Sequence, residues 1–173
     1  MKYLKTVIFV LSLVLTSFLA NSQSIREGIQ IGNKAPEIIE NSVNGQPLKL
    51  SSLAGKIVLI DFWASWCRPC RNENPSVVAA YKKFKDATFT GGIGFTVFSV
   101  SFDKDVNAWK TAIQADNLSW ESHVCKPGST ADYISRYQIR SIPTSFLIDG
   151  NGVILATNLR GEALAEKLAS LKK

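Results

Sequence analysis

One stretch in the first half of the chain constrains the fold most strongly, because an apolar run leads into two cysteines and then into a helical pattern. Residues 57–63 are almost all apolar, as expected for a strand that is covered on both faces. A helix is predicted from Pro69 to Lys85. Proline suits the first turn of a helix, since the amide that it lacks would have no partner there. Cys67 is therefore expected at or just before the helix N-terminus.

This position predicts a reactive pair of thiols. The unpaired amides and the macrodipole at a helix N-terminus favour a thiolate, which is the nucleophile of thiol–disulfide exchange. Cys70 lies within the same turn and can attack a mixed disulfide formed at Cys67. A structural disulfide or half of a zinc site is the ordinary alternative, and a zinc site completed by Cys or His would need both of the remaining residues of these types, His123 and Cys125. We therefore predict that Cys67 and Cys70 form a redox-active pair.

The residues around the cysteines resemble a known family. Asp-Phe-Trp-Ala-Ser-Trp-Cys-Arg-Pro-Cys, residues 61–70, is similar to the active-site segment of thioredoxins. The continuation Cys-Arg-Asn-Glu-Asn-Pro, residues 70–75, looks more like the TlpA/ResA branch of exported, thioredoxin-like thiol–disulfide oxidoreductases. The chain from Gly32 to Leu171 also fits the family's order of elements. It departs at Arg68-Pro69, where thioredoxin has Gly-Pro, and this change affects the expected redox potential rather than the reaction.

The remaining pattern predicts an α/β fold. Strands are predicted at residues 38–39, 48–50, 57–63, 95–101, 120–125, 144–149 and 153–157, and helices at 69–85, 106–113, 131–137 and 162–171. Strands that alternate with helices and end in a hairpin give an α/β sandwich with a mixed sheet. The resemblance implies the thioredoxin-like three-layer form of this sandwich. The turn signal Asn44-Gly45 adds an N-terminal β-hairpin to it.

Several local features refine these elements. Either Asp103 or Asp105 is expected to cap the helix that carries Val106, and Ser129 is expected to cap the short helix that follows. Pro75 lies inside the long helix and is expected to kink it.

The N-terminus has the pattern of a secretory signal. A short basic start is followed by an apolar and hydroxylated stretch over residues 6–19, and small residues precede a cleavage site after Ser22. The stretch is shorter than the roughly 20 apolar residues that a membrane span needs. We expect a cleaved signal peptide at residues 1–22 and one thioredoxin-like domain at residues 23–173, in the periplasm or otherwise exported. An uncleaved N-terminal membrane anchor is the alternative.

Charge and cysteine content exclude some classes of function. The formal net charge of +6 falls to +4 when Lys2 and Lys5 leave with the signal peptide. Basic residues occur in runs no longer than two and are interspersed with acidic ones, so no nucleic-acid-binding surface is predicted. Three cysteines are too few for a disulfide-rich scaffold, and one of them, Cys125, is left over from the redox pair.

Two acidic residues are candidates for proton transfer. Asp61 interrupts the apolar strand, and burial without an ion partner would raise the pKa of its carboxyl group. The alternative is a polar residue that faces water at the end of the strand. The resemblance implies that Asp61 is the buried acid that helps to deprotonate Cys70. It also matches Glu73, one turn after Cys70, to the acid of the ResA-like branch, although Glu73 would also suit a solvent-facing helix surface. The sequence leaves open which acid is the proton acceptor.

Three further residues are candidates for substrate binding. Trp66 precedes Cys67 and is expected in a flat apolar rim that docks partner chains, with an ordinary core aromatic as the alternative. The resemblance places Ile142-Pro143 at the cis-proline that faces the cysteines. An X-Pro bond is cis in only about 5–6% of cases in folded proteins, so this expectation comes from the family. The backbone before Pro143 would then pair with a substrate strand.

His123 and Cys125 are two residues apart on a predicted strand, and their side chains therefore share a face. A metal site or a third redox group would need both. The simpler interpretation is a buried free thiol beside a surface imidazole.

The sequence thus predicts an exported thiol–disulfide oxidoreductase that reduces disulfides of client proteins through Cys67 and Cys70, without a bound cofactor or metal. A membrane thiol-reductant donor would re-reduce it, and a monomer is expected. The alternatives are an oxidase or isomerase on the same fold, and a metallochaperone that holds copper between the two soft thiolates. A peroxiredoxin is a poorer match, because its peroxidatic cysteine is single and lies in a different loop.

Overall fold

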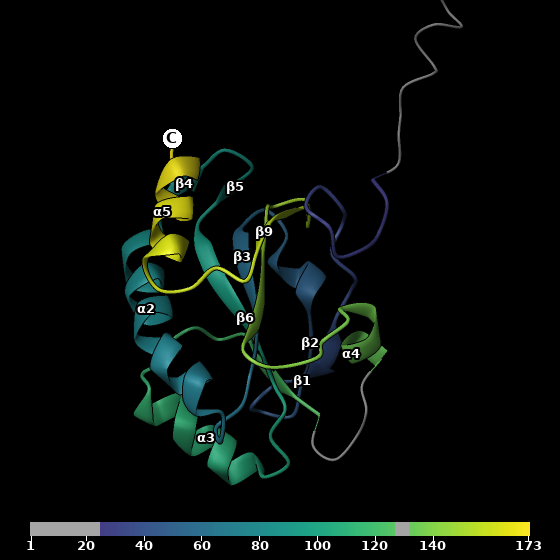
Figure 1. Cartoon of the computed structure of the whole chain (residues 1–173), viewed down its shortest axis with the longest axis vertical. Coiled ribbons are helices and arrows are strands. Elements are labelled where there is room, and N and C mark those ends of the chain that lie inside the picture. Colours follow the sequence, from purple (N-terminus) through teal and green to yellow (C-terminus); the bar gives the residue numbers. More distant parts are fainter. Residues whose placement is uncertain (1–24, 127–131) are drawn as a thin grey trace, which may run out of the picture.

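A five-stranded sheet lies at the centre of the structure (Figure 1), a computed structural model that describes residues 25–126 and 132–173. Its strands lie side by side in the order β7, β6, β3, β8, β9. Their bounds are His123–Cys125 for β7, Phe95–Ser101 for β6, Ile57–Trp63 for β3, Thr144–Ile148 for β8 and Ile154–Thr157 for β9. β3 runs parallel to β6 and β6 to β7, whereas β8 runs antiparallel to both of its neighbours, β3 and β9. The predicted mixed sheet is confirmed.

Helices cover both faces of this sheet. The helices are α2 (Arg68–Phe84), α3 (Val106–Ala115), α4 (Asp132–Arg136) and α5 (Glu162–Leu171). Helices α2, α3 and α5 lie on one side of the sheet, and α4 lies on the other with the hairpin of β1 (Ile39–Asn41) and β2 (Pro47–Lys49), as Figure 1 shows. A short 3₁₀ turn, η1, follows at Leu50–Leu53. The predicted three-layer α/β sandwich with an added N-terminal hairpin is confirmed.

The alternation of side chains along β3 divides the core into two clusters. Leu59 and Trp63 lie in the cluster that packs against α2, whereas Val58 and Phe62 lie in the cluster on the opposite face. All seven residues of β3 are buried, as expected for the central strand of a sheet that is covered on both faces. Asp61 has the same parity as Leu59 and Trp63, so its side chain belongs to the α2 side.

Helix α2 buries the side that its sequence predicts. Val77, Ala80 and Phe84 are buried, and Tyr81 is partly buried with its ring edge-on to Trp120 at a centroid distance of 5.5 Å. The helix continues through Pro75 for its full 17 residues. Helix α5 has the predicted bounds, with Leu164 and Leu168 facing the core. The two helices therefore seal one face of the sheet together.

The structure corrects several local predictions. Strand β7 covers only the last three residues of the segment 120–125, and an additional hairpin, β4 (Thr88–Phe89) with β5 (Gly92–Ile93), occupies part of a predicted loop. Asp105 caps α3, because its carboxylate accepts hydrogen bonds from the first amides of that helix. Asp103 binds other partners, and Val106 is exposed.

Two predictions concern residues outside the described part of the chain. These are the signal peptide at residues 1–22 and the Ser129 cap. Among the helices of residues 25–126 and 132–173, none has the length and apolar character that crossing a bilayer requires.

The prediction that the imidazole of His123 lies at the surface is wrong, because this side chain is buried. Its ring stacks on Trp120 with centroids 5.4 Å apart, and Nε2 lies 3.1 Å from the carbonyl oxygen of Leu118. Burial lowers the pKa of His123 to about 4, so the ring is neutral at pH 7. No cluster of three or more His, Cys, Asp or Glu side chains arranged for metal binding occurs in the described residues.

Cys125 is a buried free thiol, as the simpler interpretation predicted. Its Sγ lies 3.2 Å from the carbonyl oxygen of Asp103, and burial raises the pKa of the thiol to about 11. A thiol with such a pKa stays protonated at neutral pH and is a poor nucleophile.

We predict that Cys125→Ala keeps thiol–disulfide exchange within about twofold of wild type and lowers the free energy of unfolding by about 1 kcal/mol, because only a small buried group is lost. Disulfide reduction assays and urea unfolding would measure the two effects. An activity loss as large as that of Cys67→Ser would contradict this prediction.

Candidate active site

The two cysteines lie at the N-terminus of α2, as predicted. Cys67 is the N-cap residue, and the helix begins at Arg68 with Pro69 in its first turn. Cys67 and Cys70 are joined by a disulfide, with their Cα atoms 5.3 Å apart. The backbone amide of Cys70 donates a hydrogen bond to Sγ of Cys67 at 3.2 Å. An amide of the first helical turn therefore points at this sulfur, and this arrangement stabilises a thiolate when the disulfide is reduced.

The loop that precedes the cysteines is held from two sides through Ser65. The buried carboxylate of Asp103 accepts hydrogen bonds from the amide of Ser65 at 2.8 Å and from its hydroxyl at 2.5 Å. Arg71, one turn into α2, donates to the carbonyl oxygen of Ser65 at 3.2 Å. The guanidinium of Arg71 is fixed in turn by an ion pair with Asp116. These contacts set the loop's position relative to both β6 and α2.

The three candidate substrate-binding residues lie at the same end of the sheet as the disulfide. Phe62 pairs with Thr144 across β3 and β8, so Pro143 lies beside the end of β3. The Ile142–Pro143 peptide bond is cis, as the resemblance implied. Ile142 packs against the core cluster that contains both cysteines. Trp66 leaves 66% of its surface exposed, so it is not the core aromatic of the alternative interpretation.

Asp61 lies in the middle of β3, on the face that α2 covers. The residue is only 9% exposed, which confirms the prediction of a buried carboxyl group. Burial is the main cause that raises its pKa to about 7, with Arg160 lowering it and Glu73 raising it by smaller amounts. At neutral pH such a group is partly protonated and partly ionised, as a general acid or base requires.

Glu73 contacts the loop before α5 instead of pointing freely into solvent. Its Oε1 accepts a hydrogen bond from the backbone amide of Gly161 at 2.6 Å, and Gly161 is the N-cap residue of α5. Its negative charge also acts on Asp61. Both acids named by the sequence therefore lie on the α2 side of the sheet.

A polar row across the sheet was missed by sequence reasoning. Ser99 of β6 and Ser145 of β8 pair with Asp61 from its two sides, so the three side chains share one face. Trp120 Nε1 donates to the hydroxyl oxygen of Ser99 at 3.0 Å, and Arg160 Nη1 donates to that of Ser145 at 3.1 Å. Each serine accepts one hydrogen bond, and its own hydroxyl hydrogen is left for another acceptor. A serine inside an apolar strand is a signal that the sequence offers. The strand register that brings Ser99 and Ser145 beside Asp61 cannot be read from the sequence.

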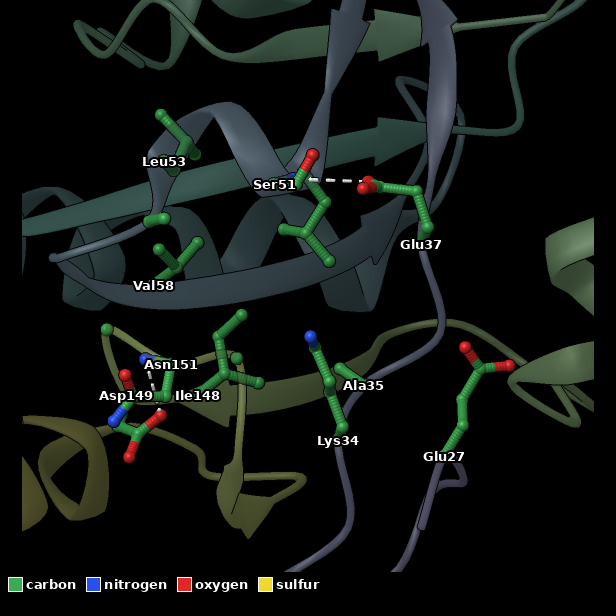
Figure 2. A pocket seen from close by; sticks show the side chains of 14 residues that line it. Glu27, Lys34, Ala35, Glu37, Ser51, Leu53, Val58, Ile148, Asp149 and Asn151 are labelled. Carbon is green, nitrogen blue, oxygen red and sulfur yellow. Dashed lines mark hydrogen bonds between the residues drawn. The ribbon is translucent and has the colours of Figure 1, made fainter. Parts of the chain in front are cut away.

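A cavity of about 450 Å³ lies at the other end of the sheet (Figure 2). It is bordered by Val58 near the start of β3 and by Ile148 at the end of β8, with the charged side chains of Lys34 and Glu37 also lining it. None of the candidate site residues borders this cavity. The chemistry of the cysteines is therefore separate from it.

Comparisons with known proteins agree with this geometry. Residues 31–157 match the model of the AhpC/TSA family. The thiol-disulfide oxidoreductase ResA of Bacillus cereus (strain ATCC 10987 / NRS 248) is 29% identical over 150 residues, which cover 87% of this chain and 81% of ResA. The thioredoxin-like protein YneN of Bacillus subtilis (strain 168) is 34% identical over 127 residues, or 73% of this chain and 70% of YneN.

A solved structure extends the similarity to the fold. The crystal structure of the thioredoxin domain of a thiol-disulfide oxidoreductase from Bacteroides vulgatus superimposes with a TM-score of 0.74 and 33% sequence identity. The match covers 83% of this chain and 98% of that domain. The chain therefore belongs to the AhpC/TSA family, within which it is a ResA-like thiol–disulfide oxidoreductase with the Cys67–Cys70 pair at the N-terminus of α2.

Proposed function

We propose that this oxidoreductase is exported and reduces disulfides of client proteins, with Asp61 as the base for Cys70. The observation that supports this proposal most is the buried carboxyl of Asp61, whose raised pKa of about 7 comes mainly from burial. It lies on the α2 side of the sheet, and Cys70 belongs to the apolar cluster on that same side. A thiol buried in an apolar cluster needs a nearby base to become a nucleophile.

The reaction then proceeds in two exchanges. The thiolate of Cys67 attacks one sulfur of the client disulfide, forms a mixed disulfide and releases the other client sulfur as a thiolate. Asp61 accepts the proton of Cys70, and the Cys70 thiolate attacks Sγ of Cys67. The second client thiolate leaves as the Cys67–Cys70 disulfide forms. Two electrons pass to the client, and its two sulfurs take up protons.

The remaining candidates have supporting roles in this scheme. Trp66 offers an exposed indole next to Cys67, and Ile142 and Pro143 lie at the same end of the sheet. We assign these three residues to client docking, with backbone pairing before Pro143 as the main contact. Glu73 carries a negative charge that acts on Asp61 and so adjusts its proton transfer.

The charges around the cysteines support a reductant. Negative charge on Asp61 and Glu73 disfavours a thiolate, and this favours the disulfide form and makes the dithiol more reducing. Arg68 next to Cys67 acts in the opposite sense, but its side chain is exposed and therefore screened by solvent and salt. An oxidase or isomerase would need the positive charge to dominate. The balance supports a reductant.

The signal pattern at residues 1–22 supports export, and an exported reductant requires a source of electrons outside the cytoplasm. We therefore propose a membrane thiol-reductant donor as the partner that regenerates the dithiol, in the periplasm or an equivalent compartment. The protein is proposed to act as a monomer.

The two thiols should give opposite results when each is replaced by serine. Cys70→Ser should accumulate mixed disulfides with clients, because the resolving thiol is absent, whereas Cys67→Ser should accumulate none. Non-reducing gels followed by identification of the captured proteins would measure both. Cys125→Ser is the matched control and should behave like wild type. Predominant capture by the Cys67→Ser variant would contradict the assignment of Cys67 as the attacking thiol.

The same captured clients report the direction of the reaction. In cells that lack the protein, the captured clients should accumulate with their disulfides intact, and alkylation of free thiols would show this. Accumulation of reduced clients in those cells would instead identify an oxidase.

Asp61 should set the pH dependence of the resolving step. A base must be ionised, so the rate at which Cys70 resolves the mixed disulfide should rise with pH through about 7, the pKa of Asp61. Asp61→Asn should lower this rate roughly 10²-fold at pH 7 and remove the inflection. Stopped-flow measurement of the resolution rate between about pH 5.5 and 8.5 would test this, because this range extends roughly 1.5 pH units to each side of that pKa. An unchanged inflection in Asp61→Asn would contradict the role of Asp61.

A measurement of unfolding supplies the control for Asp61→Asn. The folded protein holds the Asp61 proton up to about pH 7, whereas the unfolded chain releases it near its ordinary value of 3.8. Stability is therefore lost as pH rises between these values, by about 4 kcal/mol at most. Asp61→Asn should remove this loss and unfold at a higher urea concentration than wild type at pH 8, so a slower reaction would not reflect unfolding.

A further inference from the structure

The loop between β9 and α5 holds two parts of the active site at once. Arg160 Nη2 donates to the carbonyl oxygen of Pro143 at 2.6 Å, and Nη1 donates to the hydroxyl of Ser145 at 3.1 Å. The next residue, Gly161, donates its amide to Glu73 of α2 at 2.6 Å. Two adjacent residues therefore connect the Pro143 strand and the helix that carries the cysteines.

The positive charge of Arg160 also acts on Asp61, which lies one strand away from Ser145. Ser145, which Arg160 contacts, pairs with Asp61 in the neighbouring strand. Among the groups packed around Asp61, Arg160 and Glu73 are the charged ones whose fields act on it, while Ser99 and Ser145 bring only hydroxyls. The cysteines of α2 are uncharged in the disulfide form. Arg160 is therefore the cation that opposes both burial and Glu73 at this carboxyl.

We propose that Arg160 is a positioning residue for the redox reaction, whose guanidinium fixes the segment from Pro143 to Ser145 and places a positive charge beside Asp61. This inference rests on the proposed role of Asp61 as the base for Cys70. An arginine keeps its proton at any pH at which the protein is folded, so Arg160 does not itself transfer protons. Its planar fork serves two acceptors in the segment from Pro143 to Ser145, which a lysine ammonium does less well.

Two variants distinguish the positive charge of Arg160 from the hydrogen bonds of its guanidinium. Arg160→Met removes both the charge and the fork, so the pKa of Asp61 should rise above about 7, and the pH at which resolution is half-maximal should rise with it, by about one pH unit or more. Arg160→Lys keeps the charge and loses the fork. It should keep the wild-type pH profile while the KM for a disulfide-containing client peptide rises severalfold.

The experiment measures Asp61 directly. ¹³C NMR of carboxyl-labelled aspartate in the oxidised protein, with Asp61→Asn to assign the signal, reports the titration midpoint without any turnover. Arg136→Met is the matched control, because Arg136 also donates to a backbone carbonyl, that of Glu37 at 2.7 Å, but from helix α4 on the opposite face of the sheet. It should leave both the midpoint and the KM unchanged.

An Asp61 midpoint in Arg160→Met equal to that of wild type would overturn the proposal. If Arg160→Met does not fold, a KM of Arg160→Lys for the client peptide equal to that of wild type would overturn the proposal equally. A wild-type Asp61 that titrates near its ordinary value would have a different meaning, because it would contradict the proposed role of Asp61 itself.

Discussion

The burial of one carboxyl group in the middle of an apolar strand is the constraint on which the rest of the site depends. Asp61 lies on the face of β3 that α2 covers, between Leu59 and Trp63 of the same apolar cluster. A carboxylate there loses its hydration, so the fold tolerates Asp61 only by keeping it protonated part of the time or by supplying polar neighbours. The serines of β6 and β8 and the nearby Arg160 are those neighbours. Because burial destabilises the ionised form, the pKa of this carboxyl group lies near neutral pH, and we propose that it accepts the proton of Cys70.

The other half of the site is the loop at the N-terminus of α2, which the fold holds in place by contacts that are distant in sequence. Asp103 binds Ser65 from the end of β6, and Arg71 binds it from within α2. Such contacts fix the direction from which the first helical amides meet Cys67, because side chains on both elements hold the loop. These contacts hold the backbone of the loop at Ser65, while the indole of Trp66 in the same loop stays exposed.

The sequence predicted best those helices and strands whose apolar residues recur with a clear period. Helix α5 and strands β3 and β6 have the predicted bounds, because apolar periodicity alone defines them. The cysteines, Asp61 and Glu73 were found because the motif places them at fixed spacings. The Arg160 contacts with Pro143 and Ser145 were not predictable, since they depend on strand register and on where the loop before α5 turns. His123 was misplaced for a similar reason, because its stacking partner Trp120 belongs to a segment that does not extend the strand.

The central claim, that acidic groups outweigh Arg68 and make the dithiol a reductant, is tested most directly by its redox potential. Purified protein would be equilibrated with a series of glutathione ratios, and the fraction of Cys67–Cys70 disulfide would be measured by alkylation. The account predicts a potential nearer to that of thioredoxin, about −270 mV, than to that of the strong oxidant DsbA, about −120 mV. A value above about −180 mV, the potential of protein disulfide isomerase, would contradict it and would show a protein that oxidises or isomerises its clients.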